Sequence, residues 1–248
     1  MQFLDRFETV NGYPAVYDPV TDAVVVADLH LGLESLMADS GVYMPKVQLE
    51  EAKDDLSTLV EETGATRVIV LGDIKHEFSE TSYGEREEVQ DLLDMLADTV
   101  EDVLLVKGNH DNYLVYAVED YENVELSEYF LRDGALFVHG HEDVDNLETQ
   151  EADCVVMGHE HPALTLRDEI GVAEKLPAFL YGELRDGRDL LVLPAFSALA
   201  EGSQVNRVDE DELLSPVLRE KTDIGTLKAV GVDKEAGLFE FPELEKLR

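Results

Sequence analysis

Five short apolar runs, each followed by a polar cluster, constrain the fold of this chain more than any other feature of its sequence. Continuous runs of Val, Ile and Leu are typical of strands that are buried on both faces. Stretches with helical periodicity separate the first three runs, and strands that alternate with helices predict a largely parallel sheet in a layered α/β domain. The runs are AVVVADLHLG (23–32), RVIVLGDIKH (67–76), VLLVKGNHD (103–111), ALFVHGH (135–141) and CVVMGHEH (154–161).

Two amphipathic helices are predicted between the first three runs. The first spans residues 45–62, where Pro45 suits the first helical turn and Gly64 suits the end of the helix. The second spans residues 85–98. Apolar residues recur at helical spacing in both, which predicts one buried face on each helix. These faces carry Val47, Leu49, Leu56, Leu59 and Val60 in the first helix and Val89, Leu92, Leu93 and Leu96 in the second.

The pattern changes after residue 161, where shorter apolar runs follow without long helices. The RDG and DGR turns favour antiparallel hairpins, so we expect a second sheet in this part of the chain. The acidic segment 201–216 resembles a linker, but the residues that follow it are too few to form a core of their own. We therefore expect a single domain over residues 1–248, with the segment 201–216 and the C-terminal extension as parts of it.

All seven histidines lie at or just beyond the ends of the five apolar runs. Ligands on a parallel sheet gather where the carboxyl ends of the strands open into loops, so this placement predicts one shared cavity. The same ends supply Asp28, Asp73, Asn109 and Asp111. Carboxylates, imidazoles and an amide are ligands that divalent Mn, Fe or Zn accept, so the pattern indicates a metal site. The histidines are His30, His76, His110, His139, His141, His159 and His161.

The spacing of these residues supports a common cavity. Asp28 and His30 are two positions apart, as are His159 and His161, so on an extended backbone each pair projects to one side. A glycine also stands next to a candidate ligand at four strand ends. The absence of Cβ there permits a sharp turn and a close approach of the backbone to an ion or phosphate. These glycines are Gly72, Gly108, Gly140 and Gly158.

In chain order, the motifs DLH, GD, GNHD, HGH and GHEH resemble those of the calcineurin-like metallophosphoesterase superfamily, and the similarity spans about residues 23–161. DLHLGLE and GDIKHEF are similar to the archaeal branch related to the nuclease subunits Mre11 and SbcD. PAFSALAEGSQVN is similar to the same branch and extends the resemblance to most of the chain. The resemblance implies a four-layer α/β/β/α sandwich of two mixed sheets flanked by helices.

The resemblance also implies two divalent metal ions per chain, with Mn expected and Fe, Zn or Ni as alternatives. It assigns His110 to the phosphoryl group of the substrate rather than to a metal. Every family position is filled, which implies a catalytic member rather than a binding-only relative. The implied ligands are Asp28, His30, Asp73 and His161 for the first ion, and the same bridging Asp73 with Asn109, His139 and His159 for the second.

Four residues near these motifs have open roles. Asp111 could steer the ring of His110 as part of the catalytic machinery, or cap a helix that opens there. His141 follows a ligand by two positions and could contact metal or substrate, or hydrogen-bond to a ligand. Lys75 and His76 follow the bridging Asp, where much of the superfamily has an acidic or amide residue. They are candidates for substrate contact, and a salt-bridged loop lysine is the alternative for Lys75.

Five further residues are expected to have structural roles or to line the site. Glu34 and Glu160 are interpreted as solvated carboxylates, or as hydrogen-bond partners of ligands, rather than as ligands. Tyr43 and Phe78 could form walls of the cleft or pack within loops. Cys154 lies in an apolar run and is interpreted as a small buried side chain. As the single cysteine it cannot form an intrachain disulfide, which agrees with a reducing compartment.

The chain is strongly acidic, with 56 Asp and Glu against 19 Lys and Arg and a formal charge of -37. Such a charge repels itself in dilute buffer but is screened in molar salt, where the Debye length is ~3 Å. We therefore expect the cytoplasm of a halophilic cell, and the branch resemblance implies an archaeal one. The basic residues form no run, which argues against a basic nucleic-acid-binding patch. No long apolar stretch or signal peptide is present, so no membrane partner is expected.

The predicted site favours hydrolysis of phosphoesters. Paired ions bridged by one carboxylate support in-line displacement at phosphorus, and His110 could act as general acid or stabilise charge on the phosphoryl oxygens. The leading hypothesis is a phosphodiesterase acting on nucleotides or on the ends of DNA or RNA. The alternatives are a phosphomonoesterase with the same site and a metal-stabilised, non-catalytic interaction module. The intact His110 argues against the module, and the sequence identifies no protein partners.

Overall fold

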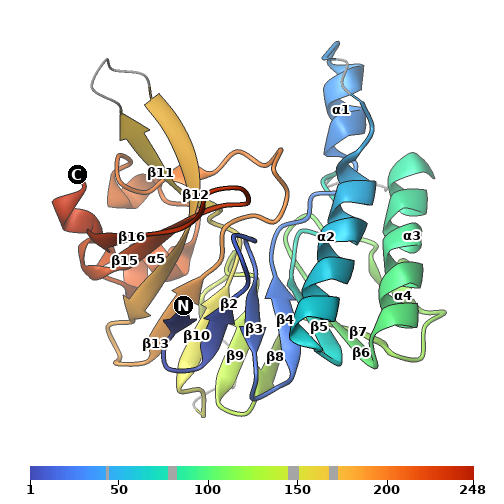
Figure 1. Cartoon of the computed structure of the whole chain (residues 1–248), viewed down its shortest axis with the longest axis horizontal. Coiled ribbons are helices and arrows are strands. Elements are labelled where there is room, and N and C mark those ends of the chain that lie inside the picture. The colour runs from blue at the N-terminus through green and yellow to red at the C-terminus, as the bar shows by residue number, and fades with distance from the viewer. Residues whose placement is uncertain (43–44, 78–82, 145–150, 168–172) are drawn as a thin grey trace.

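Two β-sheets face each other at the centre of the protein (Figure 1). The computed structural model describes residues 1–42, 45–77, 83–144, 151–167 and 173–248. In these residues, the first sheet has seven strands in sequence order, antiparallel from β1 to β4 and parallel from β4 to β7. Its strands are β1 (Gln2–Phe3), β2 (Phe7–Thr9), β3 (Val16–Asp18), β4 (Ala23–Val26), β5 (Arg67–Leu71), β6 (Asp102–Val106) and β7 (Val124–Ser127).

The second sheet has nine strands within the described ranges and is also mixed. Its central strands β9, β10 and β13 are parallel, whereas β8, β12, β15 and β16 add as antiparallel neighbours. Its strands are β8 (Tyr129–Arg132), β9 (Ala135–Val138), β10 (Cys154–Met157), β11 (Pro162–Arg167), β12 (Ala173–Glu183), β13 (Asp189–Val192), β14 (Ser203–Gln204), β15 (Lys228–Asp233) and β16 (Gly237–Glu243).

Helices cover the outer faces of both sheets, but unequally. In Figure 1, α2 and α3 lie side by side on one flank, and the short α5 lies on the other. Within the described ranges, none of the helices has the length and apolar character needed to cross a membrane. The helices are α1 (Leu33–Asp39), α2 (Gln48–Thr63), α3 (Tyr83–Thr99), α4 (Val115–Val118) and α5 (Pro216–Lys221), with 3-10 turns η2 (Glu210–Glu212), η3 (Ile224–Thr226) and η4 (Leu244–Lys246).

Three buried apolar clusters separate four layers. One packs α2 and α3 on the first sheet, the second fills the space between the sheets, and the third packs α5 and the 3-10 turns on the second sheet. Aromatic pairs join the two sheets in the middle cluster, where the ring centroids of Phe3 and Phe179 are 5.2 Å apart and those of Phe7 and Phe137 are 6.4 Å apart. These layers confirm the predicted α/β/β/α sandwich.

The first predicted helix begins later than its sequence indicates. Helix α2 starts at Gln48, and Pro45 and Val47 are exposed rather than part of the helical turn and its buried face. The cause is Glu34, whose buried Oε1 accepts hydrogen bonds from the backbone N–H groups of Val47 and Gln48, each at 3.0 Å. A distant carboxylate therefore caps this helix. The end of the helix is as predicted, because Gly64 adopts a left-handed conformation with φ of 70°.

The main difference from expectation is that the five apolar runs are divided between the two sheets. They form β4, β5 and β6 in the first sheet but β9 and β10 in the second. The second sheet thus begins at residue 129, not after residue 161, because β8 and β9 form a hairpin that starts it. The hairpin predicted at RDG joins β12 to β13. We keep the single domain over residues 1–248 as a proposal, supported by the pairing of β15 with β12.

Candidate metal centre

The candidate residues converge where strands of both sheets end. All seven histidines are described, and each ring lies within 5.4 Å, centroid to centroid, of at least one other histidine ring. The predicted single cavity is therefore built from two sheets rather than one. The loops after β4, β5 and β6 carry Asp28, His30, Asp73, His76, Asn109 and His110, and the loops after β9 and β10 carry His139, His141, His159 and His161.

The first group of potential ligands consists of Asp28, His30, Asp73 and His161, whose ligand atoms all lie within 4.8 Å of one another. Nε2 of His161 is 3.3 Å from Nε2 of His30 and 3.4 Å from Oδ1 of Asp28. Oδ1 of Asp28 is buried and has no hydrogen-bond partner among the described residues. A buried carboxylate oxygen that faces imidazole nitrogens in this way fits a bound cation.

The second group consists of Asp73, His139 and His159, so Asp73 belongs to both groups. Nε2 of His139 lies 3.3 Å from Oδ2 of Asp73 and 3.1 Å from Nδ1 of His159. The amide oxygen of Asn109 is 3.0 Å from the same Nε2. On its other side, Nδ1 of His139 donates a hydrogen bond to the carbonyl of Leu71 at 2.8 Å. This bond orients the ring with Nε2 toward the other potential ligands.

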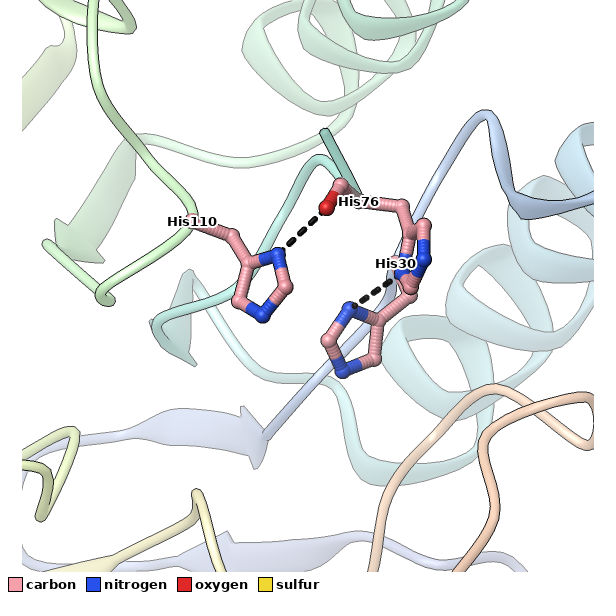
Figure 2. Close-up of side chains that lie close together, drawn as sticks. All are labelled: His30, His76 and His110. Atoms are coloured by element: carbon pink, nitrogen blue, oxygen red, sulfur yellow. Dashed lines mark hydrogen bonds between the residues drawn. The ribbon is translucent and has the colours of Figure 1, made fainter. Parts of the chain in front are cut away.

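A third group, which the sequence analysis did not separate from the others, consists of His30, His76 and His110 (Figure 2). Nδ1 of His76 is 3.3 Å from Nδ1 of His30, and the rings of His76 and His110 stack at 5.4 Å. Nδ1 of His110 donates to the backbone carbonyl of His76. Nε2 of His110 is 3.8 Å from Oδ2 of Asp73. The structure thus places His76 in contact with His110. In the sequence, the only signal for this contact is the clustering of all histidines at strand ends.

Left-handed backbone explains why the paired residues share a cavity. The expectation of an extended backbone at these pairs is wrong, because the chain turns sharply as each strand ends. Non-glycine residues in this region cost roughly 1–3 kcal/mol each and cluster at functional sites. Backbone hydrogen bonds between loops stabilise the turn, including His30 N to the Asp73 carbonyl at 2.8 Å. The φ angles are 58° at Asp28, 48° at His30, 50° at Asp73, 67° at His159 and 45° at His161.

Two of the four glycines allow a candidate carboxylate to lie directly against the backbone of a neighbouring loop. A Cβ at Gly108 would lie 2.2 Å from Oδ1 of Asp73, and one at Gly158 would lie 2.7 Å from Oδ2 of Asp28. Both distances are far below van der Waals contact, so a side chain at either position would displace a candidate ligand. The carboxylates therefore keep their positions only because these neighbours lack side chains.

Asp111 holds two loops of the first sheet together. Its buried carboxylate accepts hydrogen bonds from the backbone N–H of Ile74 at 3.0 Å, Lys75 at 3.3 Å and Gly108 at 2.8 Å. Both suggested roles are therefore replaced by a third, because these bonds go to loop backbone rather than to the His110 ring or a helix terminus. Burial, together with the charge of Asp73, raises the pKa of Asp111 to about 6.

A side chain of α3 holds the loop that carries Lys75 and His76. Lys75 is buried, and its Nζ donates to the backbone carbonyl of Glu77. Glu85 is also buried, and its Oε1 accepts from the backbone N–H of His76 at 3.0 Å and of Glu77 at 2.9 Å. Lys75 thus supports the loop from within instead of reaching toward solvent.

The remaining candidates lie on the second sheet or outside the described residues. His141 packs beside the second group, with its ring centroid 5.2 Å from that of His139. Glu160 is buried rather than solvated, and its Oε2 accepts from the backbone N–H of Ser215 at 2.9 Å, which ties this loop to the start of α5. Tyr43 and Phe78 lie outside the described residues.

Electrostatics keep most of the imidazoles neutral and the shared carboxylate ionised. Burial, with nearby imidazoles, lowers the pKa of His30 to about 4 and that of His159 to about 3. Burial opposes ionisation of Asp73, but hydrogen bonding and charge from His139 and His110 outweigh it and lower its pKa. Burial likewise opposes a charge on His139, but Asp73 and Asp28 raise its pKa to about 9. Asp73, His30 and His159 therefore have the protonation states that metal ligation requires, whereas Asp28 also raises the pKa of His161, so His139 and His161 would release a proton when a metal binds.

Comparisons with known proteins identify the family of the chain and show a similar fold. A family model described as calcineurin-like phosphoesterase matches residues 22–221. The structure resembles nuclease MPE of Pseudomonas putida at a TM-score of 0.63, with 19% identity over 97% of this chain and 98% of that chain. The E. coli phosphoesterase YfcE gives a TM-score of 0.42, with 17% identity over 73% of this chain and 83% of that chain. No curated protein sequence matches the chain.

Proposed function

This chain belongs to the calcineurin-like phosphoesterase family, and from that premise we propose that it hydrolyses phosphodiesters of nucleotides or of nucleic-acid ends at a dinuclear metal centre. The observation that carries the proposal is the position of Asp73, which belongs to two adjacent groups of potential ligands. One carboxylate shared between two cation sites is the arrangement used for in-line displacement at phosphorus.

We propose Mn as the metal, with Fe, Zn or Ni as alternatives. The donors fit such ions because they combine neutral imidazole nitrogens with carboxylate and amide oxygens. The buried Oδ1 of Asp28, which lacks a hydrogen-bond partner among the described residues, supports the same interpretation. When bound, the two ions would supply Lewis-acid polarisation of the phosphoryl group and a nucleophile at neutral pH. The proposed ligands are Asp28, His30, Asp73 and His161 for one ion, and Asp73, Asn109, His139 and His159 for the other.

His110 is the proposed catalytic residue of the chain itself. Its Nδ1 donates to the His76 carbonyl, so this nitrogen carries a proton and Nε2 is directed toward the shared Asp73. In the imidazolium form, whose second proton is on Nε2, the ring can stabilise charge on the phosphoryl oxygens, or give the Nε2 proton to the departing alkoxide and become neutral. Asp111 acts as a positioning residue in this proposal, since it fixes the loops that carry Asp73 and His110.

The acidic surface supports a proposal about the setting of this reaction. A net charge of -37 fits the cytoplasm of a halophilic, archaeal cell, where molar salt screens carboxylate repulsion. It also disfavours long polyanions as tightly bound partners, which directs the proposal toward nucleotides and strand ends. DLHLGLE, GDIKHEF and PAFSALAEGSQVN support assignment to the branch related to Mre11 and SbcD.

A substrate panel tests the proposed function. The protein is purified with Mn in molar KCl and is offered aryl phosphate monoesters and diesters, cyclic nucleotides, and single- and double-stranded DNA. We expect turnover of diesters that EDTA abolishes and Mn restores. Faster turnover of monoesters would identify a phosphomonoesterase. Metal binding without turnover of any ester would identify a non-catalytic module and refute the proposal.

A further inference from the structure

A cavity of about 470 Å³ opens beside the metal centre, and His161 forms part of its lining. Its volume lies within the range of small-molecule sites, about 300–1,000 Å³. Six segments form its walls, namely residues 12–14, Asp55 of α2, residues 161–163, strand β12, residues 194–202 and residues 232–234. The residues 194–202 come from the motif PAFSALAEGSQVN, which the proposed catalytic chemistry does not use.

Hydrogen bonds fix the wall at residues 194–202 relative to the proposed ligands. Phe196 N donates to the carbonyl of Ala27 at 2.8 Å, and Ser197 N donates to that of Asp28 at 3.3 Å. At the other end of the segment, Ser203 N donates to the carbonyl of His161 at 3.0 Å. The wall is therefore attached to both sheets at the ligand loops, and a group bound in the cavity would lie at a fixed position next to the centre.

A buried glutamine adds a further connection between the wall and the centre. Nε2 of Gln48, at the start of α2, donates to the carbonyl of His30 at 2.9 Å and to Oγ of Ser197 at 2.9 Å. Gln48 is itself buried, so these bonds are shielded from competing water. The cavity wall and the His30 loop thus form one hydrogen-bonded unit.

The residues that line the cavity favour a ligand with an uncharged aromatic ring. Two aromatic side chains, Tyr13 and Phe196, are half-buried there, and aromatic rings in a lining suit a planar ligand group. Nζ of Lys234 lies 5.2 Å from the Tyr13 ring centroid and forms an ion pair with Asp55, which neutralises its charge. Lys175 and Lys234 stand against three carboxylates in the lining, so the cavity as a whole does not attract phosphates. The carboxylates are Asp55, Glu201 and Asp233.

We propose that this cavity binds the terminal nucleoside of the substrate, next to the phosphate held at the metal centre. This inference rests on the proposed function and deepens it, because it names the group that the ester carries. A terminal nucleoside brings one neutral base and no second phosphate, which fits aromatic walls flanked by carboxylates. An internal nucleoside brings a further phosphate into an acidic lining. The protein should therefore cleave mononucleoside diesters and strand ends in preference to internal linkages.

Two diesters with the same leaving group test the inference in the Mn-loaded protein. Thymidine 5′-(p-nitrophenyl) phosphate carries a nucleoside, whereas methyl p-nitrophenyl phosphate carries only a methyl group. We expect the parent to prefer the nucleoside ester. Replacing Phe196 by Ala or Leu should reduce this preference about 10-fold, mainly through KM, since one stacking ring is lost. The Leu variant keeps apolar volume, so it remains informative if Phe196→Ala does not fold.

The control variant is Phe239→Ala, which removes an exposed aromatic side chain on β16 that does not line the cavity. It should leave the preference for the nucleoside ester unchanged. Hydrolysis of both esters with no preference in the parent, or a preference that survives both Phe196 substitutions, would refute the inference while the proposed function stands.

Equilibrium dialysis with thymidine, which has no phosphate, keeps the two proposals distinguishable. The parent should bind thymidine, and both Phe196 variants should bind it about 10-fold more weakly. If neither ester is hydrolysed, the proposed function fails, and thymidine binding still decides the inference. Equal binding of thymidine by the parent and both variants would overturn it.

Discussion

The two sheets contribute different chemistry to the candidate centre. The loops of the first sheet supply both carboxylates, the amide of Asn109 and the proposed catalytic His110, whereas the loops of the second sheet supply only imidazoles as candidate ligands. Each of the two groups that contain Asp73 takes residues from both sheets. Neither sheet can therefore form either of these two groups alone, and metal binding at them should depend on the packing of the sheets across the middle apolar cluster.

The two sides also share one structural device. A buried carboxylate that is not a proposed ligand fixes the loops on each side, Asp111 in the first sheet and Glu160 in the second. Both accept backbone N–H groups, and neither belongs to a group of potential metal ligands among the described residues. The comparison therefore separates carboxylates that hold loops from the two, Asp28 and Asp73, that face the imidazoles.

The largest expected effect comes from replacing Asp73, which belongs to both of these groups of potential metal ligands. Asp73→Asn should reduce the metal content from about two ions per chain to fewer than one and reduce activity to background, because the shared negative charge is lost. His161→Ala, on the second sheet, should remove only one ion because this residue belongs to a single group. Elemental analysis after gel filtration measures both. An unchanged metal content in Asp73→Asn would show that this carboxylate is not shared.

The next largest effect is expected for His110, and it tests whether this residue acts in catalysis rather than as a metal ligand. His110→Ala should keep both ions and melt near the parent temperature, but hydrolyse diesters with poor leaving groups ~10²- to 10⁴-fold more slowly. If His110 donates the proton, aryl esters with good leaving groups should be less affected. If it stabilises phosphoryl charge, both kinds of ester should slow together.

His141→Ala is the matched control on the second sheet, and we expect a loss of less than ~10-fold, because no proposed step uses this ring. Steady-state rates on both classes of ester give the comparison. Parent-like rates for His110→Ala on every substrate would mean that the catalytic assignment is misplaced.

A core substitution tests whether the packing of the two sheets supports the centre. Phe137 is fully buried on β9, with its ring against that of Phe7 on the facing sheet. Phe137→Ala should lower the free energy of unfolding by about 3–5 kcal/mol and also weaken metal binding. Leu218→Ala, in the outer layer on α5, should lower stability by about 2–5 kcal/mol with unchanged metal affinity. Urea unfolding and metal titration measure the two quantities, and equal metal affinities in both variants would contradict the comparison.

The smallest expected effect concerns the acidic surface, which both sides of the molecule share. The free energy of unfolding should rise by about 2 kcal/mol from dilute buffer to molar KCl, which corresponds to roughly 4–8 °C in melting temperature. Thermal unfolding of the metal-free protein over this range provides the measurement, so that metal binding does not contribute. A flat melting temperature would remove the proposal of salt adaptation.

Part of the secondary structure was predictable from local pattern, whereas strands β1, β2, β3, β7 and β8 were not predicted. The five apolar runs form the strands β4, β5, β6, β9 and β10, and Gly64 ends α2 as expected. The start of α2 was not predictable, because the cap comes from Glu34 on another helix. The burial of Lys75 was also missed, since a lysine in a loop sequence does not indicate a buried side chain.

By itself, the sequence determined that the five apolar runs form strands and which side chains stand at their ends, because both depend on residues close together along the chain. Only the tertiary structure decided how those ends meet. It placed β9 and β10 in a second sheet and gave residues of the ligand loops a left-handed conformation. It also brought backbone N–H groups from residues up to 37 positions away to donate hydrogen bonds to the carboxylate of Asp111. Such features depend on contacts between loops and strands that are distant in the sequence, and these contacts leave no periodic trace in the local sequence.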